Sequence, residues 1–266
     1  MKNHILVIES RGIESVLYCN HVPVVSLSSD YDGLSSYNLN GWLMKGENIV
    51  SLEVTGSSTQ KKYDSPGQKN SVTGQLFALS QQDISLTNID PVLRFQWKSC
   101  RGQSENNTDA LPFVDQFAFV TDCNQFNGNW QQYNSVTCLN KKDKQEIVSI
   151  VMTYFIKLLH SNRQELKHFL SHKLSRLKRC RYIDTDTYLD QYLGLGSKQK
   201  NILQYLQQLD YLDFRFLSAM AGKAIVVSNP IMANALQSQG AGSINGMWAD
   251  GPVCVARTEG QWCLVN

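Results

Sequence analysis

Alternating apolar and polar residues dominate the first half of the chain. The apolar runs HILVIES, SVLYC and VPVVSL are separated by Gly12 and by Asn20-His21, a pair suited to a tight turn because asparagine tolerates a positive φ. Strict alternation follows over residues 49–54, and further strands are expected in SVTGQLFALSQ, PVLRFQWKSC and FVDQFAFVTD. Several short strands with no convincing helix between them predict an all-β sandwich, Ig-like or jelly-roll-like, over residues 1–140.

The spacing of the apolar residues changes from that of a strand to that of a helix near Lys141. In DKQEIVSIVMTYFIKLLHSN they recur at helical intervals, and Asp143 with Glu146 suggests a capping box. A second helix is expected after Asn162 and a third near Ser197. Strands then return in YLDFRFLSAM, AIVVS, GPVCVAR and QWCLVN. Residues 141–266 are therefore predicted to form an α+β domain, with helices packed on a curved antiparallel sheet, so that the fold class is mixed.

The segment YNLNGWLMKGENIVSLEV sets polar turn residues directly before a strand. Gly46 and Asn48 are residue types that favour turns. Trp42 at the start of a strand is interpreted as a cap on the end of a sandwich core, and a sugar-stacking platform is the alternative. The segment is accordingly interpreted as scaffold.

Composition is globular and gives little sign of a charged partner. Of the 266 residues, 42% are hydrophobic and 18% charged, and the net charge of +2 is too small to indicate a nucleic-acid partner. No apolar run approaches the roughly 18 residues of a membrane span, so no membrane insertion is predicted. The first residues, MKNHILVIESRG, contain too few apolar residues to form the apolar stretch of about 7–15 residues that a signal peptide needs. The protein is expected to be periplasmic if a leader was removed, and otherwise cytoplasmic.

Two cysteine pairs are candidates for disulfides among the seven cysteines. Cys123 and Cys138 flank a polar loop that a disulfide could close, stabilising the fold by about 3 kcal/mol. Cys254 and Cys263 lie on opposite arms of an expected hairpin and could face each other if its loop has four residues. The alternative for all seven is buried free thiols, which behave as small hydrophobic groups.

Candidate metal and catalytic motifs are incomplete. Asp184, Asp186 and Asp190 resemble a calcium loop, but Leu189 and Leu195 stand where glycine and glutamate are required, and Asp186 is more simply a helix N-cap. The zinc motif H-E-x-x-H, the phosphate loop and G-x-S-x-G are also absent from the sequence. No metal site, cofactor or catalytic residue is predicted.

Two features favour binding to a protein partner. The loop FNGNWQQY carries Trp130 and Tyr133, and the second helix carries basic residues that include Arg176 and Arg179. Protein interfaces are enriched in tryptophan, tyrosine and arginine, so these four residues are the predicted partner-binding residues. A solvated helix face is the alternative for the basic residues.

SVLYCNHVPVVSL followed by YNLNGWLMKGENIVSLEV resembles the amino-terminal β-sandwich of a diffuse group of two-domain proteobacterial proteins. His21 replaces the glycine usual at the turn. The matching residues are Asn20, Pro23, Val24, Leu39, Asn40, Trp42, Leu43, Gly46, Asn48 and Ile49. The second half is similar to the cystatin or nuclear-transport-factor type, whose sheet ends in a G-x-W-x-L strand, here Gly260, Trp262 and Leu264.

The resemblance implies a non-enzymatic protein-binding function. Some proteins of the two-domain group are associated with immunity to secreted toxins, including type VI secretion effectors, so a toxin effector is the expected partner. The alternative is a carbohydrate- or small-ligand-binding periplasmic module, with Trp248 or Trp262 lining a pocket on the concave sheet. An enzyme built on that sheet is the third hypothesis, and the oligomeric state is not predicted.

Overall fold

The computed structural model describes residues 2–30, 32–57, 70–80, 89–98, 112–121, 130–160, 162–171, 173–175, 186, 189, 208–228 and 253–265. The structure is mostly β, with three antiparallel sheets and a few helices, so the β-rich, α+β character predicted from the sequence is confirmed. The chain divides into two compact units, Met1–Asn127 and Gly128–Asn266.

The predicted boundary near residue 140 falls inside the second unit. The segment just before it is hydrogen-bonded to that unit's sheet: the Asn134 N–H donates to the Arg257 carbonyl at 2.8 Å, and the Val136 N–H donates to the Gly222 carbonyl at 2.9 Å. Sequence periodicity marks where α1 begins, but these bonds assign the preceding segment to the same unit.

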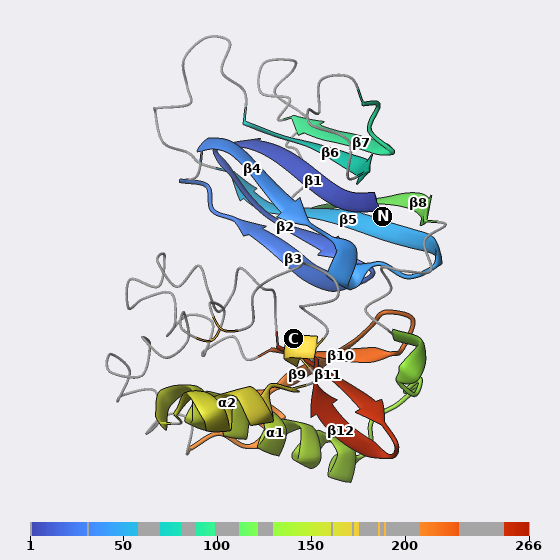
Figure 1. Ribbon diagram of the computed structural model, residues 1–266. Coiled ribbons are helices and arrows are strands. Elements are labelled where there is room, and N and C mark those ends of the chain that lie inside the picture. Colours follow the sequence, from blue (N-terminus) through green and yellow to red (C-terminus); the bar gives the residue numbers. More distant parts are fainter. Residues whose placement is uncertain are drawn as a thin grey trace. The chain divides into compact units, whose positions relative to one another are not determined.

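The first sheet of the amino-terminal unit has the order β4-β1-β6-β7 (Figure 1). The apolar run HILVIES lies in a strand, as predicted, and its Leu6 and Ile8 are fully buried. Gly74 is required where it stands: a Cβ there would lie 1.9 Å from Phe95 Cζ. The strands are β1 (Lys2–Arg11), β4 (Asp32–Asn38), β6 (Ser71–Ser80) and β7 (Leu93–Lys98).

The second sheet has the order β3-β2-β5-β8. Its first hairpin closes with Cys19 opposite Val22, and the two loop residues Asn20 and His21 have φ of 50° and 67°. Two positive φ angles match the twist of a two-residue hairpin, so the predicted turn is confirmed. The strands are β2 (Ile13–Cys19), β3 (Val22–Leu27), β5 (Gly46–Ser57) and β8 (Phe113–Thr121).

Aromatic side chains connect the two sheets of this unit. Phe95 of β7 stacks on Phe117 of β8 with ring centroids 5.2 Å apart, and Trp97 meets Phe113 at 6.4 Å. Such pairs add to the stabilisation that burial of apolar area gives.

A buried polar network fixes the segment that joins β4 to β5. This segment contains η1 (Asn40–Trp42), and Trp42 is 1% exposed. The Asn20 amide donates to the Trp42 carbonyl at 2.7 Å and to Asn48 Oδ1 at 2.8 Å, and Asn48 in turn donates to Thr121 Oγ1 at 3.1 Å. The interpretation of the segment as scaffold agrees with this burial.

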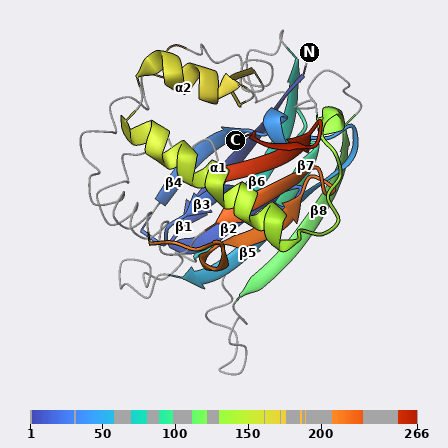
Figure 2. The same cartoon turned by 90° about the horizontal axis from the view of Figure 1, so that it is seen from below.

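The carboxy-terminal unit packs helix α1 (Lys141–His160) across one face of a sheet of order β12-β11-β10-β9 (Figure 2). The strands are β9 (Arg215–Ala219), β10 (Ala224–Ser228), β11 (Val253–Thr258) and β12 (Gln261–Leu264). Shorter helical elements are η4 (Trp130–Gln132), α2 (Arg163–Phe169) and η6 (Tyr211–Asp213). The buried apolar faces of α1 and the sheet share one core, which includes Ile147, Val151, Phe155, Ile225, Val255 and Leu264.

The caps of both α-helices are local. Asn140 and Asp143 cap α1 reciprocally: Asp143 N–H donates to Asn140 Oδ1 at 2.9 Å, and Asn140 N–H donates to Asp143 Oδ2 at 3.3 Å. The capping box was predicted between Asp143 and Glu146. It lies one turn earlier, between Asn140 and Asp143, so that prediction is wrong. Asn162 caps α2 as predicted, accepting from the Glu165 N–H at 3.0 Å.

Candidate functional site

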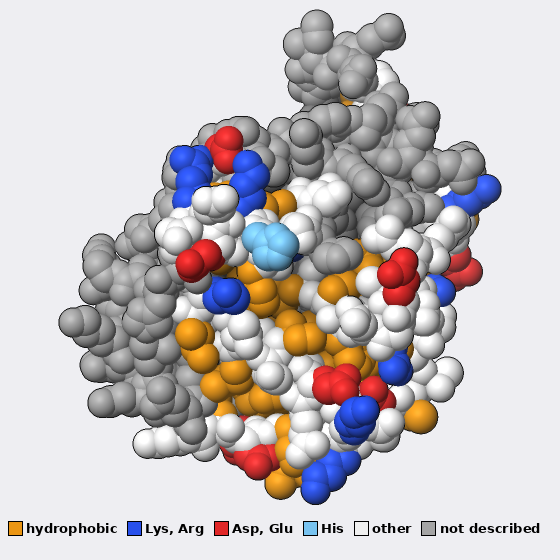
Figure 3. Space-filling view, turned by 60° about the horizontal axis from the view of Figure 1, so that its bottom comes forward, with side chains coloured by type: hydrophobic (Ala, Val, Ile, Leu, Met, Phe, Trp, Pro, Cys, Tyr) orange, Lys and Arg blue, Asp and Glu red, His pale blue; other side chains and the backbone are white. Residues whose placement is uncertain are grey.

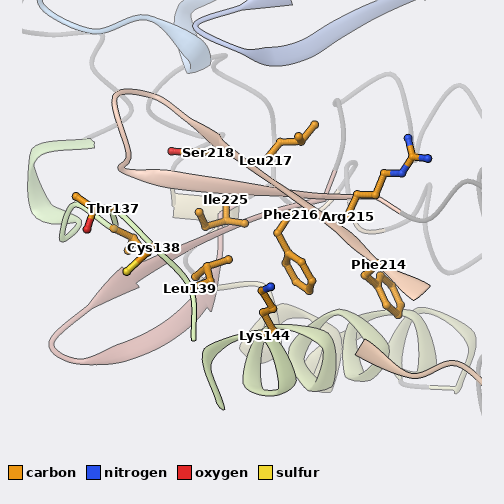
Figure 4. A pocket seen from close by; sticks show the side chains of 11 residues that line it. Thr137, Cys138, Leu139, Lys144, Phe214, Arg215, Phe216, Leu217, Ser218 and Ile225 are labelled. Atoms are coloured by element: carbon orange, nitrogen blue, oxygen red, sulfur yellow. The ribbon is translucent and has the colours of Figure 1, made fainter. Parts of the chain in front are cut away.

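An open groove of about 520 Å³ lies beside β9 in the carboxy-terminal unit (Figure 4). Its walls come from three places in the sequence: the segment of residues 136–139, the first turn of α1, and the stretch of residues 214–218. Ile225 of the neighbouring strand β10 completes the lining. The residues are Val136, Thr137, Cys138, Leu139, Lys144, Phe214, Arg215, Phe216, Leu217, Ser218 and Ile225.

Alternation along β9 directs Phe216 into the groove. Phe216 points toward α1, whereas Arg215 and Leu217 point to the other side of the strand (Figure 4). Residues of a strand face alternately to its two sides, so the sequence RFL places the phenylalanine between two outward-facing groups. Phe216 is half-buried, and Leu217 keeps 50% of its surface exposed.

The turn after β9 positions the segment that forms the opposite wall. Met220 and Ala221 have φ of 54° and 52°, and Gly222 has φ of 80°. A Cβ at Gly222 would lie 3.3 Å from the Val136 carbonyl oxygen, so glycine allows the close approach of this turn to residue 136. The wall of residues 136–139 is thus attached at the hairpin end of the sheet and runs on into α1.

Positive charge is concentrated in the groove. Lys144 points from α1 toward Phe216, and its Nζ lies 5.9 Å from the ring centroid (Figure 4). Arg215 is exposed on the other side of β9. Within the described part of the chain neither cation has an ion-pair partner, and none of the described lining residues is acidic. The groove therefore favours a ligand with negative charge and apolar groups.

The polar groups of the groove include hydroxyl, thiol and cationic side chains. Cys138, Thr137 and Ser218 carry the hydroxyl and thiol groups of its lining. A nucleophile needs a base within hydrogen-bond reach, and among the described lining residues none is histidine, aspartate or glutamate. The same lining offers a ligand aromatic contact and two cations.

Trp130 and Tyr133 were predicted to be exposed binding residues, and the structure contradicts this. Each is only 2% exposed, and their rings pack together with centroids 5.8 Å apart. The Tyr133 carbonyl also accepts a hydrogen bond from Lys223 Nζ at 2.8 Å. The segment that carries these aromatic residues is hydrogen-bonded to the sheet, and they are therefore part of a core. The polar residues around them in the sequence did not indicate this burial.

Arg176 and Arg179, the predicted basic residues of the partner site, lie outside the described residues. In the described part of the same region, Arg163 and Lys167 of α2 lie 3.6 Å and 3.3 Å from Asp186 Oδ1. A shared carboxylate offsets part of this positive charge. Asp186, considered above as an N-cap, holds two cations here.

Cys254 and Cys263 are free thiols, and the register of their hairpin explains why. The loop has two residues, Glu259 and Gly260, which places Cys263 opposite Ala256. The Cys254 carbonyl accepts from the Val265 N–H at 2.9 Å, so Cys254 lies next to Val265 instead. The predicted facing pair is wrong, because it required a four-residue loop.

Cys138 is an exposed free thiol, so the structure does not contain the predicted Cys123–Cys138 bond. Cys123 itself lies outside the described residues. Cys19 is a buried free thiol, as the alternative of small hydrophobic thiols expects.

Other predicted positions fall away from the groove. Trp262 is 7% exposed in the core beneath α1, where its Nε1 donates to Asp143 Oδ1 at 3.4 Å, and Trp248 is not among the described residues. The described residues contain no group of three histidine, cysteine, aspartate or glutamate side chains that could hold a metal ion. In the same part of the chain, no helix is long and apolar enough to span a membrane.

Sequence reasoning did not identify the groove: of its residues only Cys138 was singled out, and that was for a disulfide. The stretch YLDFRFLSAM was identified as a strand, but its place at the edge of the sheet depends on which strands pair. Lys144 was one of several lysines at the start of α1, and nothing in the sequence distinguished it from Lys142. The alternation of Phe216 with Arg215 and Leu217 was the only available signal.

None of the family models, curated proteins and solved structures with which the chain was compared matches it.

Proposed function

We propose that this protein is a non-enzymatic protein-binding protein and that the groove beside β9 is its contact site. The observation that supports this most strongly is the combination of exposed Leu217, half-buried Phe216 and the cations Lys144 and Arg215 around one open groove. Aromatic and arginine side chains beside exposed apolar surface are the usual anchors of protein interfaces.

The sequence resemblance extends this proposal to a partner. The expected partner is a secreted toxin effector of the type VI kind, which the protein neutralises as an immunity protein or inhibitor. The same resemblance leads us to propose an amino-terminal β-sandwich followed by an α+β domain of the cystatin or nuclear-transport-factor type. The two four-stranded sheets joined by Phe95 and Phe117, and the helix on a four-stranded sheet, support that architecture.

The surface over α1 is a weaker candidate for the contact. On the face shown in Figure 3, hydrophobic side chains lie among basic and acidic ones, with neither sign of charge predominating. Ile156 near the end of α1 is 40% exposed. At the start of the same helix Lys142 Nζ lies 3.8 Å from Glu146 Oε1, which partly neutralises that lysine. This surface offers a partner less charge complementarity than the groove does.

A small-ligand-binding module is the second candidate function. A volume of about 520 Å³ lies within the range of roughly 300–1,000 Å³ typical of small-molecule sites, and Phe214 and Phe216 could contact a sugar or another flat ligand. Trp262, which was predicted to line such a pocket, does not contribute, because it is buried beneath α1.

Site-specific crosslinking tests the protein-binding proposal. A photo-crosslinking amino acid replaces Leu217, and the same change at Leu212, which is 76% exposed and outside the groove, is the control. We expect a single protein to crosslink at Leu217 and not at Leu212, and the purified partner to lose activity when the full chain is added. Binding of an uncharged sugar in the groove, with no protein crosslinked, would favour the small-ligand function and contradict this proposal.

A further inference from the structure

In the described part of the chain, one edge of strand β9 has no strand partner. It pairs with β10 from Ala219 opposite Ala224 to Arg215 opposite Ser228, and it is the last strand in the order β12-β11-β10-β9. Across the described ranges, no other strand pairs with it. Main-chain N–H and C=O groups alternate in direction along a strand, so about half of those in β9 point away from β10 and can bond to an added strand.

The groove provides side-chain contacts next to that free edge. An added strand would place alternate residues on the two faces of β9, one set toward Phe216, Leu139 and Ile225 and the other toward Arg215 and Leu217. Main-chain bonds would supply affinity, and these two sets of contacts would supply selectivity.

Charge complementarity determines the kind of strand that fits. Lys144 lies on one side of β9 and Arg215 on the other, and neither has an ion-pair partner in the described structure (Figure 4). The carboxylates nearest to Arg215 in sequence, Asp210 and Asp213, accept main-chain hydrogen bonds in the cap of η6: Asp213 Oδ2 accepts from the Asp210 N–H and Asp210 Oδ1 from the Leu212 N–H. Those nearest to Lys144 pair with other cations: Asp143 Oδ1 lies 3.6 Å from Arg257 Nη1, and Glu146 Oε1 lies 3.8 Å from Lys142 Nζ.

We propose that β9 binds an extended, acidic segment of the partner protein by strand addition, with carboxylates near Lys144 and Arg215 and apolar residues on Phe216 and Leu217. This rests on the proposed function and specifies its binding mode. It differs from docking by side chains alone because it requires the partner's main chain to bond to the edge of β9.

Three capped peptides, each about as long as β9, test the strand-addition mode on the full chain. The first, the glutamate peptide, repeats Glu-Glu-Val-Val, so that each face of the added strand carries both residue types. The second, the lysine peptide, has lysine in place of each glutamate, and the third is the glutamate peptide with N-methylated main-chain amides. Amide hydrogen exchange is followed for β9 (Arg215–Ala219) and β10 (Ala224–Ser228). We expect the glutamate peptide alone to bind and to slow exchange in β9 by about tenfold or more, leaving β10 unchanged.

Matched variants connect this protection to the groove. Lys144→Glu should weaken binding of the glutamate peptide by about tenfold, whereas Lys142→Glu, in the same turn of α1 but outside the groove, should not. Leu217→Ser should weaken it, and Leu212→Ser should not. All four positions lie at the surface or half-buried, so circular dichroism should report a folded protein in each case.

The outcomes separate the two proposals. Equal binding of the lysine and glutamate peptides, or binding of the N-methylated peptide with full affinity, overturns strand addition of an acidic segment. So does binding without protection of β9. If a protein partner still crosslinks at Leu217 after such a result, the protein-binding function stands and only the strand-addition mode is rejected.

Discussion

Burial determines what each aromatic residue of the carboxy-terminal unit does. Trp130 and Tyr133 stand in a polar segment of the sequence, yet each is 2% exposed, whereas Phe216 in an ordinary strand lines the open groove. A tryptophan in a core contributes through the apolar area that it buries, and it is not available to a partner.

Replacing Trp130 by alanine should therefore destabilise the fold. We expect the free energy of unfolding to fall by about 3–5 kcal/mol, the usual cost of deleting a buried aromatic side chain. Urea denaturation measures it, with exposed Leu212→Ala as the control, expected to change stability by less than about 0.5 kcal/mol. A stable Trp130→Ala protein would show that this side chain is not part of a core.

The Cys263 thiol should make stability depend on pH in the alkaline range. Burial raises the pKa of Cys263 from 9.0 to about 11. The folded state then holds the proton more tightly than the unfolded chain, so this contribution to stability is complete below about pH 9 and is lost as the pH rises through about 11.

Unfolding free energies measured from pH 8 upward test this titration. The decrease should be smaller in Cys263→Ala than in the parent protein, and Cys138→Ala, which removes an exposed thiol, should leave it unchanged. Identical pH profiles for Cys263→Ala and the parent would contradict the assignment.

At the scale of elements, buried asparagine side chains connect the strands of the amino-terminal unit through hydrogen bonds. Asn48 is fully buried, accepts from the Met44 N–H at 2.7 Å, and donates to the Met44 carbonyl at 2.8 Å and the Gly46 carbonyl at 3.0 Å. One side chain thus serves the main chain of the turn that precedes β5.

Asn48→Ala should cost about 1–3 kcal/mol, because it leaves buried main-chain groups without their partner. Gln96→Ala is the control, since Gln96 makes an exposed hydrogen bond to Thr73 Oγ1 at 3.2 Å. Chemical denaturation of both variants gives the comparison, and equal stabilities would refute the role assigned to the network.

At the scale of the whole molecule, each unit has a core of its own, so the chain should separate into two folded parts. A fragment of residues 128–266 keeps Trp130, Tyr133 and the bond from Asn134 to Arg257. A fragment of residues 141–266, cut at the boundary predicted from the sequence, loses them.

We expect the 128–266 fragment to unfold cooperatively and at higher urea concentration than the 141–266 fragment. The physical reason is the loss of buried aromatic area together with main-chain hydrogen bonds. Circular dichroism during denaturation of both fragments provides the measurement. Equal midpoints would place residues 128–140 outside the folded unit.

The sequence by itself determined the elements that depend on near neighbours. The Asn20-His21 turn, the start of α1 at Lys141 and the Asn162 cap all follow from local chemistry, and each was predicted where it occurs. The alternation of Phe216 with its neighbours was also present in the sequence as part of a predicted strand.

Only the tertiary structure decided which strands pair and which side chains those pairs cover. Contacts between residues far apart in the chain decide the edge position of β9 and the burial of Trp130. The length of one loop decides the offset of Cys254 from Cys263. A four-residue loop over residues 257–260 would instead place Cys254 opposite Cys263, because the register of a hairpin fixes which residues face each other. The groove exists for the same reason, since its walls come from three separate stretches that the sequence alone does not bring together.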